Sequence, residues 1–390
     1  MGVPINYNLR NLIERKATTL MTAIGIGLTV AVLVTSIAMT RGMAAVFAGS
    51  GHPMQVVVLR KGADAELNST LKEEVYQIVR QIPGIAKNAA GEPMASPEAQ
   101  TVVNLPSVEN PNGMNVTVRG LLPVGVKMRE GAKLKSGRWN EPGKREVVVG
   151  EGIAARYPAA RVGKKLRFGR GEWEVVGEFS DGDSAHNSEI WADLNQLRGD
   201  FEQQGGSNSV LVRVESAAAI PAFEKAIAAD QRLGAQTMGE REYYASLTKS
   251  SSGIMLQFIG FFVAVVMAVG AGFAATNTMY AAVARRAREI GTLRALGFSR
   301  GAILRSFVFE SVCLALIGGV IGILIALPLN NMSAGIGNWQ TFSEMAFKFK
   351  VGPDAIVAGL LFAALIGALG GFLPAWSAAR KNVITAMREI

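Results

Sequence analysis

The sequence predicts an α-helical membrane protein with four transmembrane helices, one before and three after a large extracytoplasmic α+β domain with a β-rich inserted subdomain. Four apolar runs carry this prediction, because each reaches the ~20 residues that a helix needs to cross a bilayer. They occupy residues 17–40, 254–283, 306–329 and 354–379. Residues 41–253, between the first two runs, have ordinary polar composition, with 26 Lys or Arg against 25 Asp or Glu.

Positive charge sets the orientation of the four runs. Twelve Lys or Arg and only three Glu lie in the short segments 1–16, 284–305 and 380–390. Short loops rich in Lys and Arg stay on the cytoplasmic side. Both termini are therefore predicted to be cytoplasmic, with residues 41–253 outside. The net charge of +9 is a topology signal, and we expect the bilayer, not nucleic acid, as the partner of these segments.

The first element is a cytoplasmic amphipathic lead-in, residues 1–16, followed by the span at 17–40. A cleaved signal peptide is the alternative for this run. A signal peptide's apolar region is ~7–15 residues long, whereas this run has 24, so we predict an uncleaved anchor. Gly25 and Gly27 would let another helix approach it closely.

The extracytoplasmic domain is predicted in two parts. An α+β part takes about 50–121 and 207–240, and a β-rich insertion takes about 122–206, where short apolar strands alternate with Gly-rich turns. Asn68-Ser69-Thr70 is predicted to cap a helix that ends before Pro83. From about residue 243 a helical stalk is predicted to lead into the second span.

A basic connector at 284–305 joins the second and third spans. Its residues Ile290, Leu293, Leu296 and Gly297 recur at helical spacing, which predicts a short helix with one apolar face. Such a helix at the inner membrane surface is well shaped to receive a push from a soluble partner. The second span alone measures ~45 Å at ~1.5 Å per residue, against a hydrocarbon core of ~30 Å, so it would overshoot or tilt.

The third span contains one acidic residue, Glu310, which we expect to pair with Arg305 or another arginine. An outer loop at 330–353 separates the third and fourth spans, and its alternating Phe347–Val351 is predicted to be an amphipathic surface segment. Pro374 is predicted to kink or end the fourth span.

Chemical motifs are largely missing. There is no Gly-x-x-x-x-Gly-Lys-Ser/Thr phosphate loop, and His52 and His186 are the only histidines. The loop that starts at Asp181 has the look of a calcium loop but has Ala192 where the twelfth-position glutamate belongs. The one cysteine, Cys313, permits no intrachain disulfide. We therefore predict no catalytic, cofactor-binding or metal site in this chain.

The connector and the C-terminal segment resemble a known family. The run Arg285-Arg286-Ala287-Arg288-Glu289-Ile290-Gly291-Thr292-Leu293-Arg294-Ala295-Leu296-Gly297 resembles the signature of the permease subunits of MacB/FtsX-like ABC transporters. The run Pro374-Ala375-Trp376-Ser377-Ala378-Ala379-Arg380 resembles that family's closing motif. The one-plus-three span order and the split outer domain are similar as well. No ATPase domain is fused here, so the resemblance is to the split-subunit members.

The resemblance implies a mechanism. The connector would be a coupling helix docked on a separate ABC ATPase, which would hold ATP and Mg. A second permease copy or paralogue would complete a dimer in a bacterial cytoplasmic (inner) membrane. A periplasmic adaptor is a further expected partner. The permease would do conformational work outside, in export or in handling an envelope substrate. The expected docking residues are Arg285, Arg286, Arg288, Glu289, Ile290, Gly291, Leu293, Arg294, Leu296 and Gly297.

Other functions stay open on the sequence. One is an FtsX-like regulator of a cell-wall hydrolase, and another is a peptide-sensing permease. For the arginines, the alternative role is to fix topology and bind anionic lipid. The outer partner would distinguish exporter from regulator, and a receptor that needs no ATPase is a further alternative.

Overall fold

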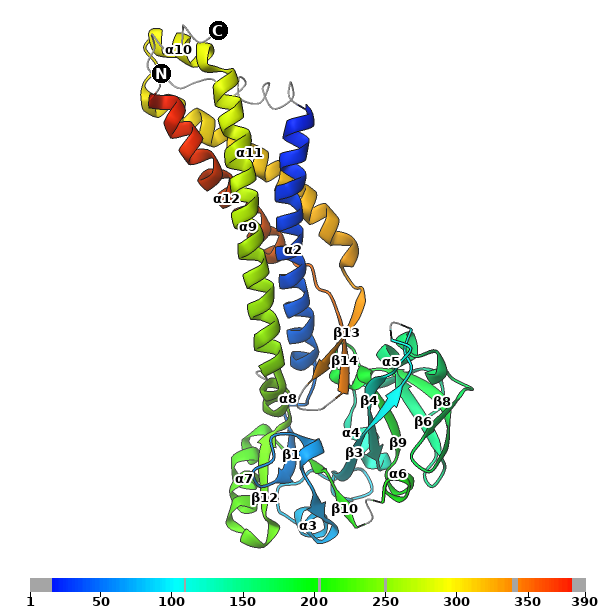
Figure 1. Cartoon of the computed structure of the whole chain (residues 1–390). Helices are drawn as coiled ribbons and strands as arrows, with labels where there is room; N and C mark the ends of the chain where they lie inside the picture. Colours follow the sequence, from blue (N-terminus) through cyan, green and yellow to red (C-terminus); the bar gives the residue numbers. More distant parts are fainter. Residues whose placement is uncertain (1–15, 109, 203–204, 249–250, 339–342, 381–390) are drawn as a thin grey trace. The chain divides into compact units, whose positions relative to one another are not determined.

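The computed structural model describes residues 16–108, 110–202, 205–248, 251–338 and 343–380 (Figure 1). The chain divides into two compact units, which are described separately. The membrane unit is Met1–Arg41, Met255–Met332 and Phe349–Ile390; the outer unit is Gly42–Ile254 and Ser333–Lys348. The predicted lead-in and C-terminal tail fall almost entirely outside the described residues and stay predictions.

Four long helices dominate the described part of the membrane unit: α2 (Lys16–Gly49), α9 (Ser251–Arg285), α11 (Arg300–Ala326) and α12 (Pro353–Arg380) (Figure 1). Each is long and apolar enough to cross a membrane, as predicted. Helix α2 continues past the predicted end at residue 40. Pro374 does not end α12, which runs on through it to Arg380.

Glycines bring the helix backbones into close contact, as the sequence predicted for Gly27. A Cβ at Gly322 of α11 would lie 2.3 Å from the Gly27 carbonyl oxygen of α2, and one at Gly318 would lie 2.6 Å from the Ala23 oxygen. Gly25, by contrast, faces open space. Helices α11 and α12 are joined by Ser311, whose Oγ donates to the Gly367 oxygen at 2.8 Å. Small residues therefore set the distances between these helices.

The outer unit is built on one ten-stranded mixed sheet. Its order is β12 (Ala235–Gly239), β1 (Gln55–Arg60), β11 (Ser209–Arg213), β3 (Ala95–Leu105), β4 (Met114–Leu121), β9 (Glu189–Asp193), β6 (Glu146–Gly150), β8 (Gly171–Ser180), β5 (Lys133–Gly137). Strand β7 (Lys165–Phe168) pairs with β8 beside this path. The pairs β4–β9 and β6–β8 are parallel and the others antiparallel.

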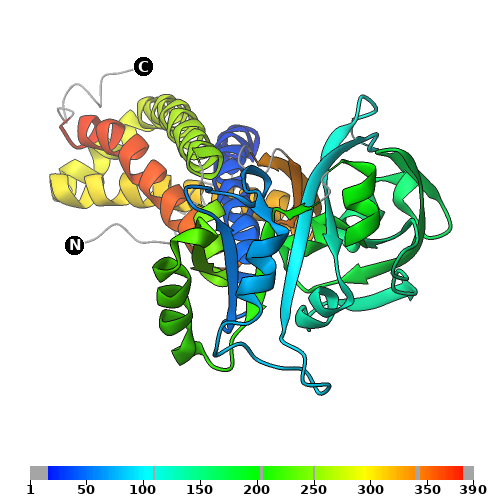
Figure 2. The same cartoon turned by 90° about the horizontal axis from the view of Figure 1, so that it is seen from below.

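Strand β3 belongs to both halves of this sheet. Its residues 95–98 pair with β11, and its residues 99–105 pair with β4. In Figure 2 the long strand stands between the α+β part and the β-rich part of the outer unit. Two apolar cores lie on either side of this change of partner.

The α+β part packs helices α3 (Glu73–Val79) and α7 (Ile220–Ala229) on the first strands, with Val56, Val79 and Phe223 in its core. The predicted cap at Asn68-Ser69-Thr70 is wrong. Ser69 Oγ accepts the Arg60 backbone N–H at 2.8 Å, so it closes the end of β1. A short pair, β2 (Leu71–Lys72) with β10 (Gly206–Ser207), then precedes α3.

The β-rich part includes α4 (Pro123–Met128), α5 (Glu151–Arg156) and α6 (Leu194–Asp200). Its core begins earlier than the predicted boundary at residue 122. Ala99, Val103, Val116 and Val118 pack with Val147, Trp173 and Ile190. Alternation of apolar and polar residues identifies a strand, but it does not show which of two cores the strand's apolar side chains enter. The boundary between the two parts of the domain could therefore not be placed from the sequence.

The predicted outer loop and stalk take more definite forms. Hairpin β13 (Ser333–Asn338) and β14 (Ser343–Lys348) belongs to the outer unit, where Ser343 Oγ accepts from Thr117 Oγ1 at 2.8 Å. The predicted stalk starts as a separate helix, α8 (Glu240–Thr248), and residues 249–250 before α9 lie outside the described residues. Trp339 of the loop also lies outside them.

Candidate functional site

The connector is a nine-residue helix, α10 (Ala287–Ala295), shorter than the predicted 284–305 (Figure 1). Gly297 closes it with φ of +92°, a conformation that favours glycine. The Gly297 N–H donates to the Arg294 oxygen and the Phe298 N–H to the Leu293 oxygen, both at 3.1 Å. This pairing is a Schellman C-cap. Two residues later Ser299 caps α11, its Oγ accepting the Ala302 N–H at 3.2 Å.

One face of α10 is buried within the membrane unit. Ile290 is only 1% exposed and packs with Val283, Phe307 and Ala378. Gly291 and Ala287 are buried beside it. Ile290 and Gly291, two of the predicted docking residues, are therefore buried in this chain. Helical spacing identified the apolar face, and the structure packs this part of it within the membrane unit.

Arg286, a third predicted docking residue, is buried too. Its guanidinium meets the Glu310 carboxylate of α11 through two bonds, Nη1 to Oε2 at 2.9 Å and Nη2 to Oε1 at 3.2 Å. The two side chains are 4% and 6% exposed. The expectation that Glu310 pairs with an arginine is confirmed for Arg286. Arg305 instead donates its Nε to the Gly301 oxygen.

The opposite face of α10 is exposed. It presents the predicted residues Arg285, Arg288, Glu289, Leu296 and Gly297, together with Thr292 and Ala295, which sequence reasoning missed. Leu296 is 73% exposed. Leu293 and Arg294 are half-buried. The structure thus gathers a mixed basic and apolar surface around Leu296; we call it the α10 outer face.

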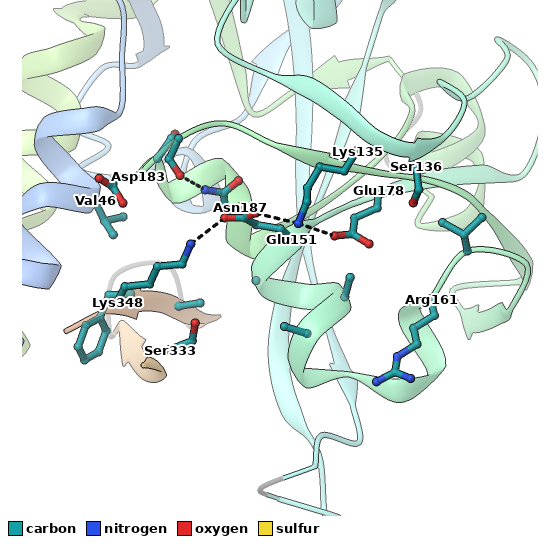
Figure 3. A pocket seen from close by; sticks show the side chains of 18 residues that line it. Val46, Lys135, Ser136, Glu151, Arg161, Glu178, Asp183, Asn187, Ser333 and Lys348 are labelled. Carbon is teal, nitrogen blue, oxygen red and sulfur yellow. Dashed lines mark hydrogen bonds and ion pairs between the residues drawn. The ribbon is translucent and has the colours of Figure 1, made fainter. Parts of the chain in front are cut away.

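The outer unit contains a cavity of about 400 Å³. Figure 3 shows Glu151 between Lys135 and Lys348, whose Nζ atoms lie 3.2 and 3.1 Å from its carboxylate oxygens. Burial opposes ionisation of Glu151, but these two lysines outweigh it and lower its pKa. Small apolar side chains, among them Ala154 and Ala346, line the cavity as well. A molecule with both polar and apolar parts would fit such a lining.

A buried ionic cluster lies where the two cores of the outer unit meet. Arg119 of β4 binds Glu66, Glu98 and Glu189 at 2.8 Å each, and Arg129 binds Glu98 at 2.7 Å. Burial raises the pKa of Glu189, but the charge of Arg119 prevails and lowers it to about 2. The carboxylates come from separate elements, so no local sequence pattern signalled the cluster.

In the loop that starts at Asp181, which was considered for calcium, polar groups form hydrogen bonds with one another. Asp181 Oδ2 lies 2.7 Å from His186 Nδ1, and the Asp181 N–H donates to Asn187 Oδ1 at 2.8 Å. Within the described ranges, no group of three or more His, Cys, Asp or Glu side chains is placed to hold a metal ion.

Comparison with known families decides the class of the protein. The MacB-like periplasmic core domain matches residues 19–230, and the FtsX-like permease C-terminal domain matches residues 261–383. The chain belongs to the MacB/FtsX family of ABC transporter permeases. The second match, residues 261–383, contains α10.

Named relatives agree with this family. The chain is 34% identical to the uncharacterized ABC transporter permease YknZ of Bacillus subtilis over 52% of its own length and 49% of that protein. It is 28% identical to the macrolide export ATP-binding/permease protein MacB of Hahella chejuensis, over 62% of this chain and 37% of that protein. It is also 27% identical to the uncharacterized ABC transporter permease MJ1507 of Methanocaldococcus jannaschii over 71% and 72%. The chain spans half or less of the first two relatives.

Proposed function

We propose that this chain is the permease subunit of an ABC transporter and transmits the work of a separate ATPase to its outer unit. The observation that supports the proposal is the α10 outer face, where Leu296 and a set of charged residues stand exposed on a helix anchored by Ile290. ATP and Mg would be held by the partner, and this chain would catalyse no reaction.

In this proposal α10 receives the movement and α9 carries it. Helix α9 has 35 residues, or ~52 Å at ~1.5 Å per residue, which exceeds the ~30 Å hydrocarbon core. A helix of this length reaches beyond the bilayer and moves as one element. The work would be done on a substrate or partner outside, in export or in handling an envelope substrate.

We further propose the orientation and assembly that this mechanism needs. The chain would lie in a bacterial cytoplasmic membrane with both termini and α10 on the cytoplasmic side. A second permease copy or paralogue would complete the complex. The arginines of the α10 outer face, Arg285 and Arg288, favour this orientation by the positive-inside rule.

The test is Leu296→Asp in the full chain, purified from its native membrane together with any bound ATPase. A buried carboxylate at a docking surface is costly, so we expect the amount of copurified ATPase and its activity to fall at least about tenfold, equivalent to ~1.4 kcal/mol. The matched control is Val108→Asp, the same change at an exposed apolar side chain of the outer unit. Equal recovery of ATPase with both variants would refute docking through α10.

Orientation is tested separately. In a Cys313→Ala background, Leu296→Cys and Val108→Cys are treated with a membrane-impermeant maleimide on intact spheroplasts. We expect labelling at Val108 and protection at Leu296 until the membrane is opened. Labelling at Leu296 on intact spheroplasts would overturn the proposed topology.

A further inference from the structure

We propose that the Arg286–Glu310 pair is a positioning device that fixes the orientation of α10 against α11, so that movement received by α10 is passed on without loss. This inference rests on the proposed function, which assigns docking to the α10 outer face. Neither residue belongs to that face, because both side chains are buried in the membrane unit.

The backbone places Arg286 at the corner itself. Helix α9 ends at Arg285 and α10 begins at Ala287. Arg286 has φ of −104° and ψ of 18°, outside the helical region, and its N–H is shared between the Ala282 and Val283 oxygens at 3.3 and 3.2 Å. The residue at which the chain changes direction therefore also carries the side chain that reaches α11.

The geometry of the pair suits orientation as well as attraction. A guanidinium and a carboxylate that meet through two bonds define a plane, which a single ammonium does not. Glu310 lies one turn along α11 from Phe307, which packs against Ile290. The Arg286–Glu310 pair and the contact of Phe307 with Ile290 thus attach the junction of α9 and α10 to α11 at two positions, one helical turn apart.

The other fully buried residues of α10 have small side chains. Ala287 and Gly291 fill the space beside Ile290, and small side chains resist rotation weakly. Leu293 and Arg294 are half-buried, so Ile290 is the one large, fully buried side chain of the described α10. The buried Arg286–Glu310 bonds add a second fixed point, which opposes rotation of α10 about its own axis. An ATPase pushing on Leu296 would turn a loose α10 instead of displacing α9 and α11.

The first test needs no ATPase. Spin labels are placed at Thr292 on α10 and Ile317 on α11, both exposed, in the full chain with Cys313→Ala in nanodiscs. Arg286→Met and Glu310→Gln should broaden the measured distance distribution, while the exchanged double variant Arg286→Glu/Glu310→Arg should narrow it again. The control Arg305→Met removes an exposed arginine of α11 and should leave the distribution unchanged.

The second test measures coupling with the copurified ATPase and unlabelled variants. We expect the permease-stimulated kcat to fall about tenfold in the single variants, a size typical of coupling between sites, while the permease concentration giving half-stimulation changes less. The exchanged variant should recover kcat. If Arg286→Met fails to fold, Arg286→Lys is used in its place. Lysine keeps the positive charge but cannot form the two parallel bonds of a guanidinium.

The outcomes separate the two proposals. Unchanged distances, or broadened distances with normal kcat, would refute the positioning role and leave docking standing. Failure of the exchanged variant to recover either readout would also refute it, since the pair would then act through something other than its mutual bonds. Normal docking by Leu296→Asp would refute the proposed function, and the distance measurement would still decide whether the pair orients α10.

Discussion

Gly322→Ala should separate α2 from α11. The added Cβ would lie 2.3 Å from the Gly27 oxygen, 2.9 Å from Val30 Cβ and 3.0 Å from the Ala31 nitrogen. Two of these three atoms belong to the α2 backbone, so no side chain can turn aside to make room. The substitution adds one methyl group and changes no charge, which limits the perturbation to helix spacing.

The cost follows from the distances. Real Cβ atoms essentially never approach another heavy atom closer than 3.0 Å, and the added Cβ would lie 2.3 Å from the Gly27 oxygen. The two helices must therefore move apart by about 0.7 Å. A gap of this size loses a quarter or more of the dispersion energy of each contact between α2 and α11. Overpacking of this kind costs about 1–3 kcal/mol. The intrinsic gain of alanine over glycine in a helix, up to about 1 kcal/mol, offsets part of it.

Cys313 offers the assay, since it is the one cysteine of the chain and lies half-buried on α11. Its reaction with a fluorogenic maleimide during heating in detergent reports opening of the helices. We expect the midpoint to fall by several degrees, at about 2–4 °C per kcal/mol. The matched control is Gly25→Ala, where the Cβ meets nothing within 4 Å. Equal midpoints for the two variants would refute the argument.

Two further predictions concern the ionic cluster. Arg119→Met should destabilise the outer unit by about 3–5 kcal/mol, because the buried Glu66 and Glu189 lose their arginine and Glu98 keeps only Arg129. The slower-exchanging amides of β4 and β9 should lose protection in hydrogen exchange, whereas Arg138→Met, at an exposed arginine, should leave them nearly unchanged. Acid should weaken the same region: the pKa of Glu189 is lowered from 4.5 to about 2, so its contribution is complete above about 4.5 and is lost as the pH falls towards 2. Trp191, whose Nε1 donates to Glu189 at 2.8 Å, should report this by fluorescence, and a signal unchanged across that range would contradict it. Burial raises the pKa of Glu240, which acts in the opposite direction and should make the loss shallower than Glu189 alone would give.

The membrane helices were predictable because their signal is compositional. The run 354–379 is apolar after its first residue, Asp354, and the helix α12 differs from it by one residue at each end. The sequence predicted that glycines allow close helix packing, but it did not say which glycine contacts which helix. Gly25 and Gly27 are the same residue type, and only Gly27 contacts α11.

The connector shows where periodicity stops being informative. The pattern found the apolar face of α10, and the structure turns part of that face, Ile290, into the bundle while leaving Leu296 outside. Which end of an apolar stripe is covered depends on α11 and α12, and nothing within the connector encodes their position. For the same reason Arg286 looked like its neighbours Arg285 and Arg288, although it is paired with Glu310 24 residues away.

Strand β3 has a practical consequence for anyone who wishes to trim this protein. Removing residues 122–206 at the boundary suggested by composition would strip Ala99, Val103, Val116 and Val118 of the side chains that cover them. The remaining protein would expose apolar side chains on β3 and β4 and an unpaired sheet edge, which favours aggregation. The β-rich part is therefore not a separable module, because strands outside the predicted boundary supply part of its core.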